Sequence, residues 1–428
     1  MNAQSILTIY LVLFTAEYLF QQLLTVLNVR YVRRHGGSVP LPFTSHIDGE
    51  TYGKAASYTV EKGRFGMLER TVTAVFLLGL ILSGAFGRLD TLLAGAGLPG
   101  RIHGILYVFI ITLLFSLVSL PFSAYVQFRI EDRYGFNTMS AGLFFLDTLK
   151  SLLISAVIFF PLLYGLFFLI DTAGASWWLF AFGGVALFQL IMTILYPLVI
   201  APLFNKFTPL EDGRLRNRLY ALAERLDFRT SGIFVMDGSK RSTHSNAFFT
   251  GIGKVKRIVL YDTLLERLND EEIEAVLAHE IGHERKKHTV KMYIVSMILL
   301  AVVLYAADML LAYEPLYRAF GFAASKPYAL LIIFSICAGP LTFLAKPLLT
   351  AWSRKFEYEA DRFAVRSLEN AGGRQHPLIS GLLKLHTSNL ANLTPHPLYS
   401  FYHYSHPALR ERVAAIVRAE AGEALNEQ

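Results

Sequence analysis

Seven long apolar runs constrain the fold of this chain more than any other feature of its sequence. Each run is long enough to cross the roughly 30 Å hydrocarbon core of a bilayer as a helix. The composition agrees, because 54% of the 428 residues are hydrophobic and only 17% are charged. We therefore expect a mainly α-helical membrane protein with about seven transmembrane helices. The expected spans are Ser5–Leu27, Met67–Phe86, His103–Leu120, Ser151–Ile170, Trp177–Val199, Val290–Ala312 and Tyr328–Thr350.

Basic residues in the connecting loops indicate how these spans are oriented. The first loop carries six Lys and Arg residues, whereas the loop around Asp171 carries none. The long fifth connection ends in Arg285-Lys286-Lys287, and the chain after the last span is basic again. Because Lys and Arg concentrate on the cytosolic side, we place the N-terminus outside and the fifth connection and C-terminus in the cytosol. The net charge of +7 is then mostly a topology signal, and we expect no nucleic-acid binding.

The fifth connection has the pattern of a folded domain. A helical stretch over Arg214–Leu226 precedes apolar strand segments at Gly232–Met236, Asn246–Gly251 and Arg257–Tyr261, and a helix begins near Asp270. We expect an N-terminal membrane domain with five spans over residues 1–204. A cytosolic α+β domain should follow over residues 205–428, interrupted by two transmembrane helices at about 290–350.

One motif in this second domain carries chemistry. His279 and His283 lie four residues apart in a predicted helix, as the sequence His-Glu-Ile-Gly-His. Residues at this spacing share a helix face, so both imidazoles can bind one Zn²⁺ while Glu280 acts on a metal-bound water. A chance match is the alternative, and the acidic first turns of the helix argue against it.

A catalytic zinc site needs a third protein ligand and one position open for water. Glu357 and Asp361 are four residues apart on another predicted helix, so Glu357 can bind the metal while Asp361 hydrogen-bonds a ligating histidine. Glu359 lies about 200° around that helix and should face elsewhere, with little effect on the site. The alternative for this stretch is a solvated acidic face paired with neighbouring basic residues. Cys337 is the only cysteine and sits in an apolar span, which excludes a Cys-ligated zinc.

These motifs resemble the type 1 CAAX prenyl protease family of integral-membrane zinc proteases. The histidine motif is followed by Glu-Tyr-x-Ala-Asp, with two apolar spans between them. Further matches, in the family's order, are Glu131–Asn137, Pro202–Leu210, and Tyr402–Pro407 with Glu411-Arg412. The resemblance implies that the spans enclose a water-filled chamber, with a zincin-type metalloprotease domain at its cytosolic roof.

The resemblance also implies roles for individual residues. It implies that His279, His283 and Glu357 bind one Zn²⁺ per chain and that Glu280 acts as general base and acid. It implies that His406 stabilises the oxyanion and that Arg412 supports that region. An extended substrate would pair with the strand formed by Asn246, Ala247, Phe248 and Phe249. Two alternatives stay open. His406 could only cap a helix that begins at Pro407, and Phe248 and Phe249 could belong to the core.

Ionisable residues inside the spans fit either a chamber or local pairing. Glu17, Asp308 and Lys346 could line the chamber, while Asp308 and Lys346 could instead pair or reach the span ends. Trp177 stands at the start of a span and is typical of an interfacial anchor.

The sequence thus predicts a zinc-dependent endopeptidase, acting as a monomer in the bilayer, that cleaves prenylated CAAX-type or membrane-associated polypeptides. One alternative is a quality-control protease for misfolded membrane proteins that uses the same site. Another is a non-catalytic chamber protein that binds lipid or peptide around a structural zinc. The intact Glu280 argues against this last alternative, because a structural zinc needs no general base. Short loops favour a prokaryotic inner membrane over the endoplasmic reticulum.

Overall fold

The structure is a computed structural model that describes all residues except 42, 252–255, 369–375 and 421–428. The helices are α1 (Ala3–His35), α2 (Gly49–Leu82), α3 (Ala85–Ala94), α4 (Gly100–Tyr125), α5 (Ala141–Thr172), α6 (Trp177–Leu195), α7 (Arg214–Arg225), α8 (Asp262–Arg267), α9 (Asp270–Arg285), α10 (His288–Leu310), α11 (Glu314–Ala319), α12 (Pro327–Thr342), α13 (Lys346–Ser367), α14 (Pro377–Ser388), α15 (Pro397–His403) and α16 (Leu409–Glu420). The strands are β1 (Phe207–Pro209), β2 (Gly232–Met236), β3 (Ala247–Thr250) and β4 (Arg257–Tyr261).

Six described helices are long and apolar enough to cross a membrane. They are α1, α2, α4, α5, α6 and α10. Helix α4 continues through a π-helical segment to Glu131, and α6 continues through a π-helical and then a 3-10 segment to Leu203. Large apolar side chains such as Val157 and Leu187 are exposed on these helices, as expected for surfaces that face lipid. The expected mainly helical membrane architecture is therefore confirmed.

The seventh expected span, Tyr328–Thr350, is not one straight helix. The chain bends by 70° between α12 and α13, and only the two helices together are long and apolar enough to cross a membrane. Pro340 lies inside α12 and Pro347 lies in the first turn of α13, and prolines lack the N–H that a continuous helix would need. The apolar composition continues across the bend, which is why hydropathy alone predicts an unbroken span.

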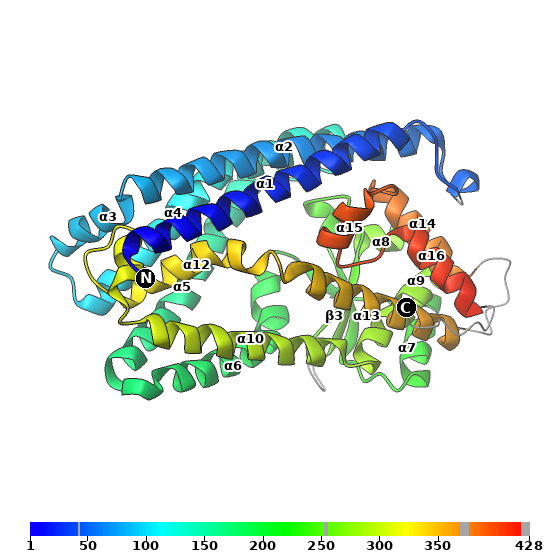
Figure 1. Cartoon of the computed structure of the whole chain (residues 1–428). Helices are drawn as coiled ribbons and strands as arrows, with labels where there is room; N and C mark the ends of the chain where they lie inside the picture. Colours follow the sequence, from blue (N-terminus) through cyan, green and yellow to red (C-terminus); the bar gives the residue numbers. More distant parts are fainter. Residues whose placement is uncertain (42, 252–255, 369–375, 421–428) are drawn as a thin grey trace.

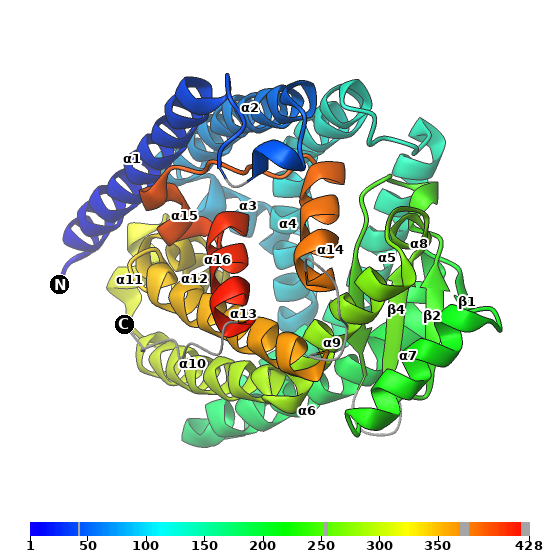
Figure 2. The ribbon, with the colours of Figure 1, turned by 90° about the vertical axis from the view of Figure 1, so that its right-hand side faces the viewer.

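The spans are arranged around an interior. Neighbours contact one another in the order α1, α2, α4, α5, α6 and α10, and α12 packs against α1 and α4. Figure 1 shows the long helices side by side, and Figure 2 shows the same helices end-on, as the wall of a ring. Helices α9, α13, α14 and α16 lie at the near end of that ring in Figure 2.

A four-stranded sheet lies in the second domain, in the order β1-β2-β4-β3. Strand β2 pairs parallel with β4, and β1 and β3 pair antiparallel with β2 and β4. The strands at Gly232–Met236 and Arg257–Tyr261 match their expected bounds, and β3 is the edge strand that the sequence places at Asn246–Gly251. One hydrophobic core, which includes Leu260, Ala278 and Ile281, joins the sheet to α9.

One alternative and one expectation about intramembrane residues do not hold. Asp308 and Lys346 do not pair, because the Asp308 carboxylate accepts a hydrogen bond from the Trp177 indole at 2.6 Å, and Lys346 Nζ lies 3.2 Å from His403 Nδ1. Trp177 is only 3% exposed, so it is a packed residue whose N–H is satisfied by Asp308 rather than an interfacial anchor. Glu17 and Lys346, in contrast, both line one internal cavity.

Candidate active site

Helix α9 is fixed at its start by a capping box. The Asn269 side chain accepts a hydrogen bond from the Glu272 N–H, and the Glu272 carboxylate accepts one from the Asn269 N–H, both at 2.9 Å. Glu272 also accepts a hydrogen bond from Lys384 of α14 at 2.8 Å. Burial works to raise the pKa of Glu272, but Lys384 and Ser380 outweigh it and hold that pKa below its ordinary value. These contacts anchor the helix that carries the histidine motif.

The two histidines of α9 and Glu357 of α13 bring their ligand atoms together. His279 Nε2 and His283 Nε2 are 3.2 Å apart, and the Glu357 oxygens lie 3.6 Å and 3.4 Å from them. Two nitrogens on a tetrahedral zinc, each about 2.0–2.1 Å from the metal, would be about 3.3 Å apart. Oε2 of Glu357 is buried without a hydrogen-bond partner among the described residues. The cluster therefore fits a metal ion.

Close packing of α9 against α13 makes this convergence possible. A Cβ atom at Gly282 would lie 3.1 Å from Ala360 Cα and 3.2 Å from Ala360 O, which is tighter than most real Cβ contacts. The glycine of the histidine motif therefore lets the backbone of α13 approach α9. This approach brings Glu357, one turn before Ala360, to the ligating edges of both imidazoles.

A buried ion pair holds the first histidine in place. The Asp361 carboxylate lies 2.8 Å from His279 Nδ1 and accepts two hydrogen bonds from Arg412 of α16, at 2.9 Å and 2.6 Å. Burial works to raise the pKa of Asp361, but Arg412 outweighs it and keeps that pKa low. Arg412 also lies 3.7 Å from Glu357 and 3.4 Å from Nδ1 of His279, so it contacts both carboxylates and the first histidine.

The second histidine has a support that the sequence does not predict. Nδ1 of His283 lies 3.0 Å from Nδ1 of His288, and Nε2 of His288 lies 3.0 Å from the Glu359 carboxylate. The ring of His288 stacks on Phe356 at 4.1 Å. Glu359 is therefore linked to the site by a contact that the sequence does not predict. Glu359 faces away from the ligand atoms on α13, but His288 at the start of α10 links it to His283.

A cavity of about 550 Å³ opens beside the ligand cluster. Glu280 and His406 line it together with the ligands. His406 Nε2 lies 3.3 Å from a Glu357 oxygen, and the side chain of His406 is largely exposed. Burial raises the pKa of Glu280 above its ordinary value, although the two histidines oppose the shift. A carboxyl group with a raised pKa is better able to hold a proton between two steps of a reaction.

The expected substrate strand borders this cavity. Asn246, Ala247 and Phe248 line it, and β3 leaves one edge unpaired because it is the last strand of the sheet. Phe249 is not part of the lining. Its side chain packs on the domain core next to Phe228, with ring centroids 6.2 Å apart. The core alternative therefore holds for the Phe249 side chain.

Asn389, the residue directly after α14, holds the segment that leads into this strand, and sequence reasoning missed it. Its amide accepts a hydrogen bond from Ser245 N–H at 3.0 Å and donates one to Ser245 O at 3.1 Å. The contact joins residues 144 positions apart, and a lone asparagine near a helix end carries no signal for it.

A second cluster connects the strand to the membrane domain. His244 lies 3.3 Å from the Glu131 carboxylate and stacks on Phe136 at 3.9 Å. Glu131 also accepts hydrogen bonds from Tyr58 at 2.7 Å and from Lys62 at 3.1 Å, both on α2. The Glu131–Asn137 motif thus packs beside the segment that leads into β3, and the motif itself is the signal that could have predicted this contact.

Comparisons with known proteins agree with this architecture. The family model described as "CAAX prenyl protease N-terminal, five membrane helices" matches residues 28–206, and the model for peptidase family M48 matches residues 209–420. The chain belongs to peptidase family M48. Relatives of this M48 peptidase include CAAX prenyl protease 1 of Saccharomyces cerevisiae, 34% identical over 94% of this chain and 93% of that protein. The Homo sapiens CAAX prenyl protease 1 homolog is 34% identical over 88% of both.

A solved structure extends this match to three dimensions. The crystal structure of S. mikatae Ste24p is similar to this M48 peptidase with a TM-score of 0.89 and 31% sequence identity, over 97% of this chain and 99% of that chain. This M48 peptidase is therefore an integral, multi-pass membrane metalloendopeptidase with a polypeptide substrate, as the sequence predicts. The comparisons do not favour a quality-control protease or a non-catalytic binding protein.

Proposed function

We propose that this M48 peptidase uses one zinc ion to cleave prenylated CAAX-type polypeptides, or other membrane-associated polypeptides, from a site that opens toward the membrane interior. The names of its relatives support the substrate class. The observation that carries the proposal is a series of adjoining cavities between the spans and the proposed metal ligands.

These cavities adjoin one another through shared residues. The active-site cavity shares Asn389 and Ala391 with a cavity of about 430 Å³. That cavity shares Gly66 and Arg70 with a third, of about 650 Å³, which lies between α1, α2 and the start of α13. Cavities that adjoin in this way would give a peptide whose lipid lies among the spans a path to the ligand cluster, which suits a lipidated or membrane-tethered substrate.

His279, His283 and Glu357 would hold the zinc ion. When bound, zinc lowers the pKa of a coordinated water and polarises the scissile carbonyl. Asp361 fixes the orientation of the His279 ring through Nδ1, and Arg412 holds Asp361 in turn. The free edge of β3 can pair with an extended peptide, because backbone hydrogen bonds are independent of sequence.

Glu280 and His406 would act on the reacting atoms. We assign to Glu280 the proton taken from the attacking water and its return to the leaving amine, in line with its raised pKa and its place on the cavity wall. We assign to His406 a hydrogen bond to the carbonyl oxygen as negative charge develops there. Its Nε2 lies 3.3 Å from Glu357, so it faces the ligand cluster from the open side.

The basic loops support a cytosolic peptidase domain with the N-terminus outside, and the short outer loops support a prokaryotic inner membrane. We also propose that the enzyme acts as a monomer, since a single chain supplies all three ligands and the lining of the cavity. Replacing Cys337 by Ser and introducing single cysteines at exposed Arg34 and Ala96 would test the orientation. We expect an impermeant thiol reagent to label only the Ala96 position in intact cells.

The substrate test compares three substrates on the same enzyme in lipid nanodiscs. A farnesylated CAAX peptide, the same peptide without the lipid, and an unfolded membrane protein are digested by wild type and by Glu280→Gln. We expect kcat/KM for the farnesylated peptide to exceed that for the bare peptide by at least about tenfold, equivalent to about 1.4 kcal/mol of lipid binding. Preferred digestion of the unfolded protein would instead support quality control. No digestion by zinc-loaded enzyme would support a binding protein.

A further inference from the structure

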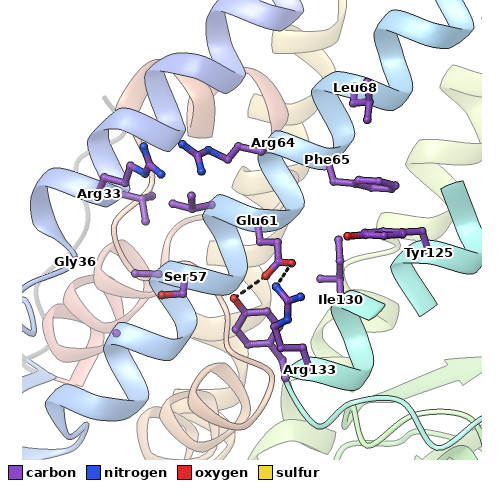
Figure 3. Close-up of a pocket in the computed structure, with 15 residues that line it drawn as sticks. Arg33, Gly36, Ser57, Glu61, Arg64, Phe65, Leu68, Tyr125, Ile130 and Arg133 are labelled. Carbon is purple, nitrogen blue, oxygen red and sulfur yellow. Dashed lines mark hydrogen bonds and ion pairs between the residues drawn. The ribbon is translucent and has the colours of Figure 1, made fainter. Parts of the chain in front are cut away.

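A further cavity, of about 830 Å³, lies on another side of α2 from the cavities near the active site. It sits between the C-terminal end of α1, the N-terminal half of α2 and the end of α4 with its π-helical continuation (Figure 3). Ser57, Glu61, Arg64 and Leu68 recur at a spacing of three or four residues, so one face of α2 forms its wall. Lys62 and Gly66 on another face line the internal cavities instead.

The cavity carries uncompensated positive charge. Its three arginines are Arg33, Arg64 and Arg133, and its one acid is Glu61. Glu61 is already engaged, because it pairs with Arg133 at 2.6 Å and accepts a hydrogen bond from Tyr134 at 3.0 Å.

The remaining two arginines are left without partners. Neither Arg33 nor Arg64 has a hydrogen bond or ion pair to any residue that the structure describes. Figure 3 shows their guanidinium ends pointing toward one another from α1 and α2. Both arginines are exposed, and their like charges repel each other, so an anion that contacts both guanidinium groups would be bound favourably.

One wall of the same cavity is apolar. The rings of Phe65 and Tyr125 stack with centroids 4.5 Å apart and planes at 17°. Leu68 follows one turn further along α2 and is 53% exposed, and Tyr125 is 44% exposed. The side chains that continue from the arginines along α2 therefore present a hydrophobic surface to the outside of the ring of helices.

The span bounds expected from the sequence place both arginines near the level of the lipid headgroups. Arg33 lies six residues beyond Leu27, where the apolar run of α1 ends, which is about 9 Å along a helix. Arg64 lies three residues before Met67, where the apolar run of α2 begins, which is about 4.5 Å. The headgroup layer on each side of a bilayer is about 5–8 Å thick, and helix tilt shortens both distances. The apolar wall of Phe65, Tyr125 and Leu68 leads from this layer toward the hydrocarbon.

We propose that this cavity binds an anionic phospholipid of the leaflet on the peptidase side, with its phosphate between Arg33 and Arg64 and an acyl chain along Leu68 and the Phe65–Tyr125 pair. Basic pockets between transmembrane helices at this depth are suited to anionic headgroups. The apolar wall distinguishes a lipid from a free phosphate ion, which would gain nothing from it. The site is separate from the metal centre and does not depend on the substrate proposed above.

Binding of a short-chain phosphatidylglycerol to the full-length protein in neutral detergent tests this site, with native mass spectrometry as the readout. We expect one saturable site per chain, at least about tenfold weaker binding of the matched phosphatidylcholine, and no displacement by millimolar inorganic phosphate. The Arg33→Gln/Arg64→Gln variant should bind phosphatidylglycerol about 30-fold more weakly, and each single variant about fivefold, because each basic residue near an anionic headgroup contributes about that factor.

The matched control removes the same charges from the same two helices. Arg30 of α1 and Lys54 of α2 are exposed and do not line the cavity. We expect Arg30→Gln/Lys54→Gln to change phosphatidylglycerol binding by less than about threefold. An equal loss in both double variants would show diffuse surface attraction and overturn the proposal. Full displacement by inorganic phosphate would do the same, since it would identify a free-ion site.

Discussion

His283, His288 and Glu359 form a short hydrogen-bonded relay, and the donor and acceptor of each bond can be assigned. A histidine that binds a metal through Nε2 carries its proton on Nδ1. Nδ1 of His283 is 3.0 Å from Nδ1 of His288, so His283 donates this hydrogen bond and His288 accepts it. The proton of His288 is then on Nε2, which donates to the Glu359 carboxylate at 3.0 Å. Glu359 thereby fixes one tautomer in each ring and the orientation of a metal ligand.

Breaking the relay should weaken metal binding by an amount that depends on where it is broken. His288→Leu removes the acceptor of the His283 proton, and loss of such an outer partner typically lowers metal affinity by about 10–100-fold, or about 1.4–2.8 kcal/mol. Glu359→Ala leaves the N–H of His288 unpaired at a residue that is only 3% exposed, which costs about 1–3 kcal/mol. We expect about a tenfold loss of zinc affinity. Glu359→Gln keeps an oxygen acceptor and should lose only a few-fold.

The assay is zinc content by elemental mass spectrometry after equilibration of each purified variant with a series of zinc buffers. Lys355→Ala, at an exposed position on the same helix, serves as the control and should bind zinc like wild type. Wild-type zinc affinity in both His288→Leu and Glu359→Ala would refute the relay. A loss in Glu359→Ala without one in His288→Leu would show that Glu359 acts by another route.

Four further predictions follow from the same contacts. Glu280→Gln should retain zinc while its kcat falls by a factor of at least about 10². Glu357→Ala should lose both zinc and peptidase activity. Metal content and peptidase activity measured on one preparation of each variant check both predictions. His406→Ala should lower kcat and kcat/KM by similar factors of about 10²–10³ with unchanged zinc content, and normal kcat in a protein of lower Tm would make His406 a structural residue. Glu272→Gln should lower Tm at neutral pH. Because the folded-state pKa of Glu272 lies below its ordinary value, its charge stabilises the fold above about pH 4–5, and the Tm difference should shrink as pH falls through the folded pKa. A difference that grows with acidity would contradict the assignment.

The elements that the sequence predicts well are those whose signal is local. The helical spacing of His279 and His283, with an acidic first turn, predicts α9, and the apolar run Arg257–Tyr261 predicts β4 to the residue. Glu357 joins the two histidines as expected because its pattern with Asp361 also lies on one helix face.

The features that the sequence does not predict depend on the direction of a helix axis or on contacts between residues that lie far apart in the chain. Hydropathy measures how apolar a segment is and not where its axis points, so it cannot show the 70° bend before Lys346. The partner of Glu359 is 71 residues away and lies across a membrane hairpin, and no spacing rule links the two. Trp177 stands at the start of a span, where an interfacial anchor is expected. Its indole instead donates a hydrogen bond to Asp308, a contact that the composition does not predict.

The bend between α12 and α13 has a consequence for how the enzyme matures. The histidines precede the hairpin formed by α10 and α12, and Glu357 follows it on α13. A nascent chain therefore holds only two of the three ligands until this hairpin has entered the bilayer and turned the polypeptide back against α9. We therefore expect metal capture to require completed insertion, and a half-synthesised chain to lack peptidase activity. For the same reason, no soluble fragment cut on either side of the hairpin can carry the full ligand set.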